Sequence, residues 1–300
     1  MKIRVILVTV IATAMSFTGL QNLQADTTNF VINLGGNGFL SWTNPPDAAG
    51  CKIYWAPTVN GPWSANWDAF KYMAATGAVM QVPVPMFYQV AAIADTNTLL
   101  VHSDGVNGST TITDESGHAI ARYGDASIST AQSKFGGSSI HFDGVGDYLS
   151  LPANSDWAFG TNDFTVDFWV YYTVAPGTAN IIGQHTSGVF TDWCVIHNQG
   201  TLVFYINSDV AASYSWSPAL NTWHHLAVTR AAGTVRLFIN GSLMNSNLNA
   251  SSIGSGRSLT IGAAENPTYF LTGYLDEIRI KNGKAAWTSN FTPPGSPYAQ

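Results

Sequence analysis

The 300-residue sequence predicts an all-β fold class: a two-sheet antiparallel sandwich preceded by a small β-sandwich-like domain. Short runs of alternating apolar and polar residues recur at spacings of roughly 8 to 12 residues, which is typical of packed antiparallel sheets. Dipeptides of Gly, Pro, Asn and Asp separate these runs and mark turns. Charged residues make up only 10% of the chain, and Lys and Glu, which cover the surfaces of helix-rich proteins, are scarce.

The first 25 residues have the pattern of a secretory signal peptide. Lys2 and Arg4 supply the positive start, residues 5–15 are apolar, and Ala25 offers a small residue for cleavage. The apolar run is shorter than the about 20 residues that a spanning helix needs, so we expect no membrane span after cleavage. The predicted location is therefore secreted, extracellular or at the cell surface, with a virion surface as the alternative.

The net charge limits the partners. The whole chain carries 12 Lys and Arg against 18 Asp and Glu, a net charge of −6. Loss of Lys2 and Arg4 would leave 10 against 18, a net charge of −8. We expect no nucleic-acid partner, because phosphate contacts need a basic surface.

Residues 26–95 are predicted to form the small β domain. Apolar runs such as GFLSW and GCKIYWA are separated by Asn44-Pro45 and Asn60-Gly61. The segment GFLSWTNPPDAAGCKIYWA resembles two strands of a fibronectin type III module. Cys51 lies here and Cys194 lies in the next domain; an exported protein can pair two cysteines, but two buried, unpaired thiols are the alternative that we favour.

Residues 96–300 are predicted to form the main sandwich. In the segment DFTVDFWVYY, Phe164, Val166, Phe168 and Val170 share one face, because side chains alternate along a strand. A hairpin is expected over 223–240, followed by a type I′ turn at Asn240-Gly241, since both positions of that turn need φ > 0. The remaining expected strands are 99–101, 139–142, 148–151, 259–263 and 274–280.

Four phrases identify a family resemblance, namely FDGVGDYLSL, DFTVDFWVYY, WHHLAVTRAAGTVRLFING and GYLDEIRIKNGKAAWTSNFTPP. In this order they resemble the LamG-like jelly roll of the concanavalin A-like lectin/glucanase superfamily, over residues 98–298. The resemblance implies a jelly-roll sandwich that mostly presents sugars or protein surfaces. Modules of this kind also occur in secreted bacterial proteins and phage virion proteins.

No catalytic motif accompanies the resemblance, so we predict that the protein is not an enzyme. Glucanases of this fold carry an E-x-D-x-x-E strand, which is missing here, as are G-x-S-x-G and H-E-x-x-H. The adjacent acidic residues Asp276 and Glu277 are expected to point to opposite faces of their strand, which excludes a retaining carboxylate dyad about 5 Å apart.

A structural Ca²⁺ is the one cofactor that the resemblance implies. Its expected ligands are Asp104, Asp143 and Asp276, because family members hold calcium with loop carboxylates. Calcium favours oxygen ligands of this type. The alternative is that these aspartates stabilise turns through their own backbone.

Sugar binding needs exposed aromatic side chains with polar groups beside them. The candidates are Asp192, Trp193, Tyr205, Tyr214, Trp216 and Tyr269. The alternative is that most of these aromatic residues belong to the core.

The sequence thus predicts a secreted, non-catalytic binding or adhesion module whose partner is a glycan. A structural or host-recognition module of a phage virion or cell-surface assembly, binding a surface protein, is the second hypothesis. A carbohydrate-active enzyme is the third, since fold alone does not determine function.

Overall fold

The computed structural model describes residues 97–186, 189–254 and 256–299, together with five strands nearer the N-terminus whose backbone alone is described. Side chains of 189–191 lie outside the described part. The chain divides into two compact units, Met1–Asp95 and Thr96–Gln300. Within the described residues, no helix is long and apolar enough to cross a membrane.

In the first unit, the described strands form one three-stranded and one two-stranded antiparallel sheet. The strands are β1 (Thr9–Ile11), β2 (Ile32–Leu34), β3 (Leu40–Trp42), β4 (Ala48–Ala56) and β5 (Phe87–Ala94). The predicted signal peptide lies outside the described residues except for β1, and the fibronectin-like resemblance stays a prediction. Cys51 lies on β4, but its side chain is not described.

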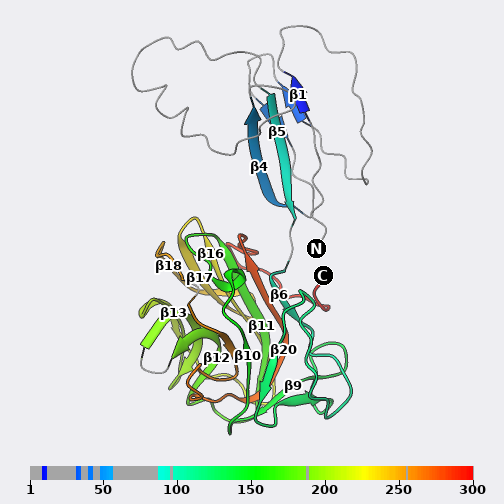
Figure 1. Cartoon of the computed structure of the whole chain (residues 1–300). Coiled ribbons are helices and arrows are strands. Elements are labelled where there is room, and N and C mark those ends of the chain that lie inside the picture. Colours follow the sequence, from blue (N-terminus) through cyan, green and yellow to red (C-terminus); the bar gives the residue numbers. More distant parts are fainter. Residues whose placement is uncertain are drawn as a thin grey trace. The chain divides into compact units, whose positions relative to one another are not determined.

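The second unit is the predicted antiparallel sandwich. Its seven-stranded sheet has the order β15-β14-β13-β12-β19-β10-β7. These strands are β7 (Ala121–Tyr123), β10 (Tyr148–Leu151), β12 (Thr178–Thr186), β13 (Val189–Asn198), β14 (Thr201–Ile206), β15 (Asp209–Ser215) and β19 (Leu259–Ile261). Figure 1 shows β10, β12 and β13 together in this layer.

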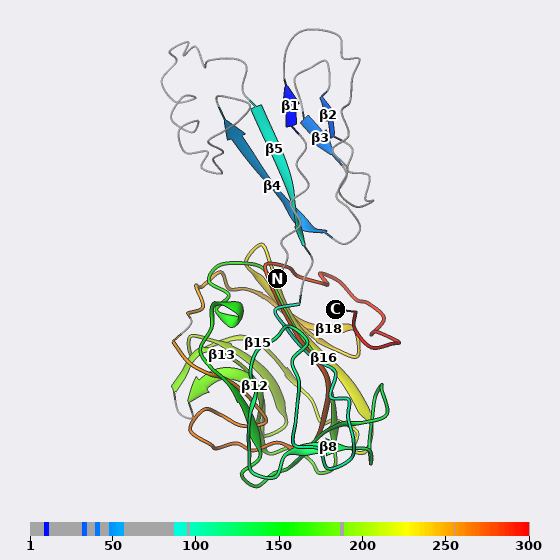
Figure 2. The same cartoon turned by 45° about the vertical axis from the view of Figure 1, so that its right-hand side comes forward.

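The other sheet has the order β18-β17-β16-β11-β20-β9-β8, and β6 also pairs with β20. The strands are β6 (Leu99–Val101), β8 (Ser127–Ser129), β9 (Ser139–Asp143), β11 (Phe164–Tyr172), β16 (Trp223–Ala231), β17 (Thr234–Ile239), β18 (Ser242–Leu248) and β20 (Thr272–Asn282). The turned view in Figure 2 separates β16 and β18 from β12 and β13. A single 3-10 turn, η1 (Ser155–Trp157), is the helical element in the described residues.

Turn chemistry defines the hairpins. Ala232 and Gly233 join β16 to β17 with φ of 48° and 75°, and Asn240 and Gly241 join β17 to β18 with φ of 50° and 78°. Positive φ at both central residues is the type I′ geometry, whose twist matches that of the strands. The predicted Asn240-Gly241 turn is therefore confirmed.

The core lies between the two sheets. The predicted inward face of β11, consisting of Phe164, Val166, Phe168 and Val170, belongs to it. The opposite face of β11 is also buried, because the segment 283–299 covers it. Trp287 and Phe291 of that segment stack at 3.9 Å, and both rings contact His225.

Candidate functional site

The outer face of the seven-stranded sheet carries a small apolar patch. Trp193, Val195, Leu202 and Phe204 point into the core, so alternation turns the residues between them outward. These outward residues include Cys194, Ile196 and Val203. Tyr205 and Tyr269 pack against these three residues and remain partly exposed. We call these five residues the tyrosine patch.

Strand register and one loop bring the patch together. Cys194 pairs with Tyr205, and Ile196 pairs with Val203. Tyr269 comes from the loop after β19, and its carbonyl accepts a 2.8 Å hydrogen bond from the backbone of Asn180, the neighbour of Ile196 across the sheet. A ring from a strand and a ring from a loop therefore flank the same apolar surface.

A charged cluster lies near the end of β12 and the start of β13. The Arg257 guanidinium donates to Glu265 at 2.8 Å and to Thr186 at 2.7 Å, and it lies 3.9 Å from a carboxylate oxygen of Asp192. The loop that carries Tyr269 also carries Glu265, whose backbone donates to the carbonyl of His185. We call Arg257, Glu265, Asp192, Thr186 and His185 the charged cluster.

Burial changes the ionisation of two members. It lowers the pKa of His185 to about 4, and the nearby Arg257 charge adds to this, so the imidazole is neutral at neutral pH. Burial raises the pKa of Asp192, which the Arg257 charge opposes and Glu265 reinforces. The cluster therefore holds one guanidinium and two carboxylates that are all partly buried.

Asp192 and Tyr269 both adopt left-handed backbone, with φ of 64° and 59°. This region is uncommon for side chains larger than Gly and costs about 1–3 kcal/mol. Such strain gathers at functional sites, where the surrounding structure holds it. Tyr269 belongs to the tyrosine patch and Asp192 to the charged cluster.

The prediction is wrong for Trp193. Its side chain is fully buried in the core, and its indole N–H donates to the carbonyl of Trp157 and to Gln184. Adjacent residues of a strand face opposite ways, so Cys194 rather than Trp193 reaches the outer face. A buried ring cannot stack on a sugar.

Two other predicted residues lie away from the tyrosine patch. Trp216 packs against the core and contacts Tyr172 and His224 edge-on. Tyr214 is 41% exposed on the edge strand β15, opposite the core residue Leu202. Of the six, the structure therefore brings Tyr205 and Tyr269 together in the tyrosine patch and places Asp192 in the charged cluster.

The three predicted calcium ligands separate into two groups. Asp276 accepts the backbone N–H groups of Lys134 and Phe135, and Asp104 lies so close to Gly136 that a Cβ there would overlap its carboxylate. Asp104 and Asp276 therefore adjoin one loop. Burial raises the pKa of Asp276 to about 7, and its second carboxylate oxygen is buried without a hydrogen-bond partner.

Asp143 belongs to a different group, with Asp125 and Asp147. One carboxylate oxygen from each lies within 4.8 Å of the others. The two oxygens of Asp147 accept the backbone N–H groups of Asp125 and Asp143, which orients the group. Carboxylate oxygens of this kind fit a hard cation such as Ca²⁺.

The expected orientation of Asp276 and Glu277 is wrong. Leu275 and Ile278 both face the core, and a register shift between β11 and β20 inserts one extra residue between them. Glu277 takes a φ of 49° at this β-bulge, and bulges re-aim side chains. Both carboxylates therefore bond to groups on the outer face, Asp276 to the Lys134 loop and Glu277 to His102 and to the Tyr298 backbone.

The bulge does not create an accessible carboxylate dyad. Asp276 is fully buried and Glu277 is 1% exposed. The Tyr298 segment closes over Glu277, so a substrate would have no route to it in this structure.

Residues 142–286 match the family model of the Concanavalin A-like lectin/glucanases superfamily. The second unit carries a domain of this superfamily. The match begins within β9 and ends just after β20, so it includes every strand that contributes to the tyrosine patch. No curated protein matches the chain in sequence.

Solved structures similar to this concanavalin A-like domain include binding domains of toxins. The binding domain of Paraclostridial Mosquitocidal Protein 1 has a TM-score of 0.47 and 17% identity, covering 64% of this chain and 49% of that one. The binding domain of botulinum neurotoxin serotype D has a TM-score of 0.49 and 16% identity, covering 63% of this chain and 49% of that one. The receptor binding domain of botulinum neurotoxin type G has a TM-score of 0.46 and 15% identity, covering 63% of this chain and 48% of that one. The chain spans about half the length of each.

Sequence reasoning missed Arg257, Glu265 and His185. Arg257 and Glu265 come together through a loop, and His185 is separated from Glu265 by 80 positions. The one available signal was Glu265 itself, since Glu is so scarce in this chain.

Proposed function

We propose that the outer face of the seven-stranded sheet binds carbohydrate, as part of a non-catalytic binding module. The observation that carries this is the combination of Tyr205 and Tyr269 on an apolar patch with a charged cluster alongside. A sugar offers an apolar C–H face for stacking on aromatic rings and hydroxyl groups for hydrogen bonds to carboxylates. The strained backbone of Asp192 and Tyr269 supports the same assignment.

The test is binding to a glycan array by the wild type and by Tyr205→Ala and Tyr269→Ala. Loss of a stacking ring from a site of this kind should weaken binding by about tenfold or more, since aromatic anchors dominate binding energy. Tyr214→Ala is the matched control, because Tyr214 is exposed on the same sheet but outside the patch. Unchanged binding by both patch variants would contradict the proposal.

The cofactor proposal is a structural Ca²⁺. Two sets of residues fit it: Asp125 with Asp143 and Asp147, and Asp104 with Asp276. One buried oxygen of Asp276 has no hydrogen-bond partner, and a bound calcium ion would supply it with a positive charge. Calcium would hold loops together there and takes no part in stacking a sugar.

Melting of the wild type with calcium and with EGTA tests this proposal. Calcium should raise the melting temperature, because a ligand that binds only the folded state stabilises it. Asp143→Asn and Asp276→Asn assign the site, since the variant at the true site loses the calcium response. An identical melting temperature in calcium and EGTA would refute the cofactor.

Location at the cell exterior follows from the predicted signal peptide and remains part of this proposal. Detection of the mature chain in culture medium, with its N-terminus after Ala25, tests it.

A further inference from the structure

The charges around the tyrosine patch bear on which glycans it accepts. Resting on the proposed function, we propose that this site selects neutral saccharides and rejects sialylated or sulfated ones. The reason is that the described strands and loops around the site offer an anion no cation that is not already paired with a carboxylate.

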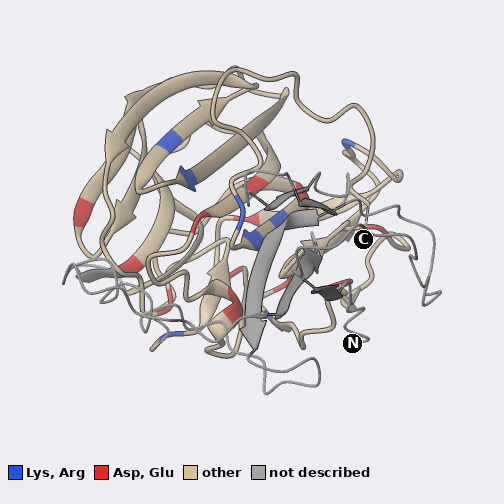
Figure 3. Ribbon diagram, turned by 90° about the horizontal axis from the view of Figure 1, so that it is seen from above, with Lys and Arg blue, Asp and Glu red and all other residues tan. Residues whose placement is uncertain are grey.

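The strands of this sheet are almost free of basic residues. Among the seven strands, Arg122 on β7 is the one Lys or Arg. Five strand intervals separate β7 from β14, which is about 24 Å at the usual spacing of neighbouring strands. That exceeds the screening distance of roughly 8–10 Å at ordinary salt, so Arg122 cannot attract an anion bound at Tyr205. Figure 3 shows how few blue segments the ribbon carries.

Arg257, the cation of the charged cluster, is already engaged. Glu265 and Thr186 accept hydrogen bonds from its guanidinium, and Asp192 lies 3.9 Å away. His185 adds no positive charge, because burial holds its pKa far below neutral. One guanidinium against two carboxylates leaves a net charge of −1 at the site.

An anionic sugar would meet this negative field without gaining a bidentate arginine contact, which is what carboxylate and sulfate recognition usually requires. Like charges placed together at a binding surface disfavour a partner strongly. A neutral sugar avoids this repulsion and still finds hydrogen-bond acceptors on Asp192 and Glu265.

An array of matched glycans, each with a neutral, a sialylated and a sulfated form, tests the inference. We expect the neutral member of a pair to bind about tenfold or more tightly than its anionic partner. Equal or tighter binding of the anionic members would overturn this inference and leave the proposed function intact. A failure of every glycan to bind would overturn both.

Variants sharpen the same test. Glu265→Gln removes one carboxylate from Arg257, so the difference between neutral and anionic members should shrink. Glu115→Gln is the control, because Glu115 is exposed in the loop before β7, away from the tyrosine patch and the charged cluster, and the substitution removes the same charge. An equal shift from both variants would show that net charge alone acts, which contradicts a role for the cluster.

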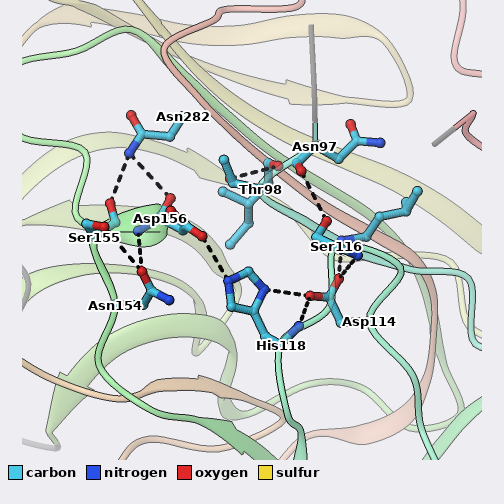
Figure 4. Close-up of polar contacts among 11 residues, drawn as sticks. Asn97, Thr98, Asp114, Ser116, His118, Asn154, Ser155, Asp156 and Asn282 are labelled. Carbon is cyan, nitrogen blue, oxygen red and sulfur yellow. Dashed lines mark hydrogen bonds and ion pairs between the residues drawn. The ribbon is translucent and has the colours of Figure 1, made fainter. Parts of the chain in front are cut away.

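A second inference concerns His118 and is independent of the ligand. Figure 4 shows its ring between two carboxylates. Nδ1 lies 2.6 Å from Asp114 and Nε2 lies 2.8 Å from Asp156 of η1. Asp114 also accepts the backbone N–H groups of Leu100, Ser116 and His118.

The hydrogen-bond chemistry defines the charge of the ring. An ionised carboxylate only accepts hydrogen bonds, and a neutral imidazole donates from one nitrogen only. We infer that His118 is an imidazolium that clamps the loop 114–118 onto η1, and that the clamp weakens when the ring loses a proton.

The surroundings agree with a charged ring. Asp114 and Asp156 are the titratable groups that face it, and Trp157 contacts it edge-on at 4.9 Å. Partial burial lowers the pKa of His118, but the hydrogen bonds and charges of the two aspartates outweigh this and raise it above its ordinary 6.5. The stabilisation is therefore complete below about pH 6.5 and is lost as the pH rises through the raised pKa.

An NMR titration of the His118 ring tests the clamp. We expect a pKa above 6.5, protons on both nitrogens at pH 6, and a lower pKa in Asp156→Asn. The melting temperature of the wild type should fall more than that of His118→Gln between pH 6 and 9. His141→Gln is the control, since the ring of His141 rests on Tyr274 with no carboxylate bonded to it in the described contacts. A His118 pKa of 6.5 or less with a single protonated nitrogen would overturn the inference.

Discussion

The outer faces of the two sheets of the second unit differ: one is covered by the chain's own C-terminal segment and the other is partly exposed. On the eight-stranded sheet, the segment 283–299 covers β11, β16 and β20, and polar residues beneath it are fully buried. On the seven-stranded sheet, Tyr205 of β14 and Tyr269 of the loop after β19 are partly exposed beside a charged cluster. A face that its own chain already occupies has no room for a ligand, which is why we propose the seven-stranded sheet as the binding face.

The closed face depends on a buried network. Asp167 accepts two hydrogen bonds from Arg279, at 2.9 and 3.2 Å, and one from the Tyr298 hydroxyl. The Arg279 guanidinium lies 3.7 Å from the centre of the Tyr298 ring. Burial raises the pKa of Asp167, but Arg279 and His225 outweigh it and hold the pKa below its ordinary value. These contacts fasten the covering segment to the sheet.

The largest expected effect is that of Asp167→Ala. Removal of one partner of a buried ion pair destabilises a fold by about 3–5 kcal/mol, because the other charge stays buried without its counter-charge. Urea denaturation of the variant measures this loss. A loss below about 1 kcal/mol would show that the covering segment is not anchored there.

An intermediate effect is expected for Tyr298→Phe. The variant keeps the ring against Arg279 and removes the hydroxyl that Asp167 and His225 share. A buried hydrogen bond to a charged group contributes about 1.5–3 kcal/mol, which the same denaturation experiment resolves. Stability equal to that of the wild type would mean that the hydroxyl contributes nothing to closing this face.

The smallest effect on stability is expected at the open face. Tyr205→Ala and Tyr269→Ala should each cost about 1 kcal/mol or less, because their rings are partly exposed and pack on a small cluster of three apolar residues. Glycan binding by these two variants should nevertheless weaken by about tenfold or more. A loss of stability as large as that of Asp167→Ala would make these tyrosines structural and remove the contrast between the faces.

Much of the sandwich could be predicted from the sequence, because local chemistry determines it. The Asn240-Gly241 turn and the alternation from Phe164 to Val170 are local signals, and both appear in the structure as expected. The order of the four family phrases also predicted the superfamily to which the second unit belongs.

The errors arise where alternation is ambiguous or broken. Trp193 to Ile196 are all apolar, so the sequence does not show which of them face the core. At Asp276 and Glu277, a β-bulge shifts the alternation by one residue. A bulge of this kind depends on the partner strand, which one segment of sequence does not contain.

The proposed calcium ligands and the charged cluster were hard to predict for another reason. Asp125 and Asp147 join Asp143 only when β7 and β10 pair, and Arg257 meets Thr186 across 71 positions. Long-range pairing of polar residues leaves no periodic pattern in the sequence.

Hydroxyl-radical footprinting tests the assignment of the ligand face most directly. The protein is labelled with and without the tightest-binding glycan from the array, and oxidation of each tyrosine is measured. We predict protection of Tyr205 and Tyr269, with no change at the exposed Tyr123 and Tyr214. Protection at Tyr123 or Tyr214 without protection of Tyr205 and Tyr269 would contradict the account.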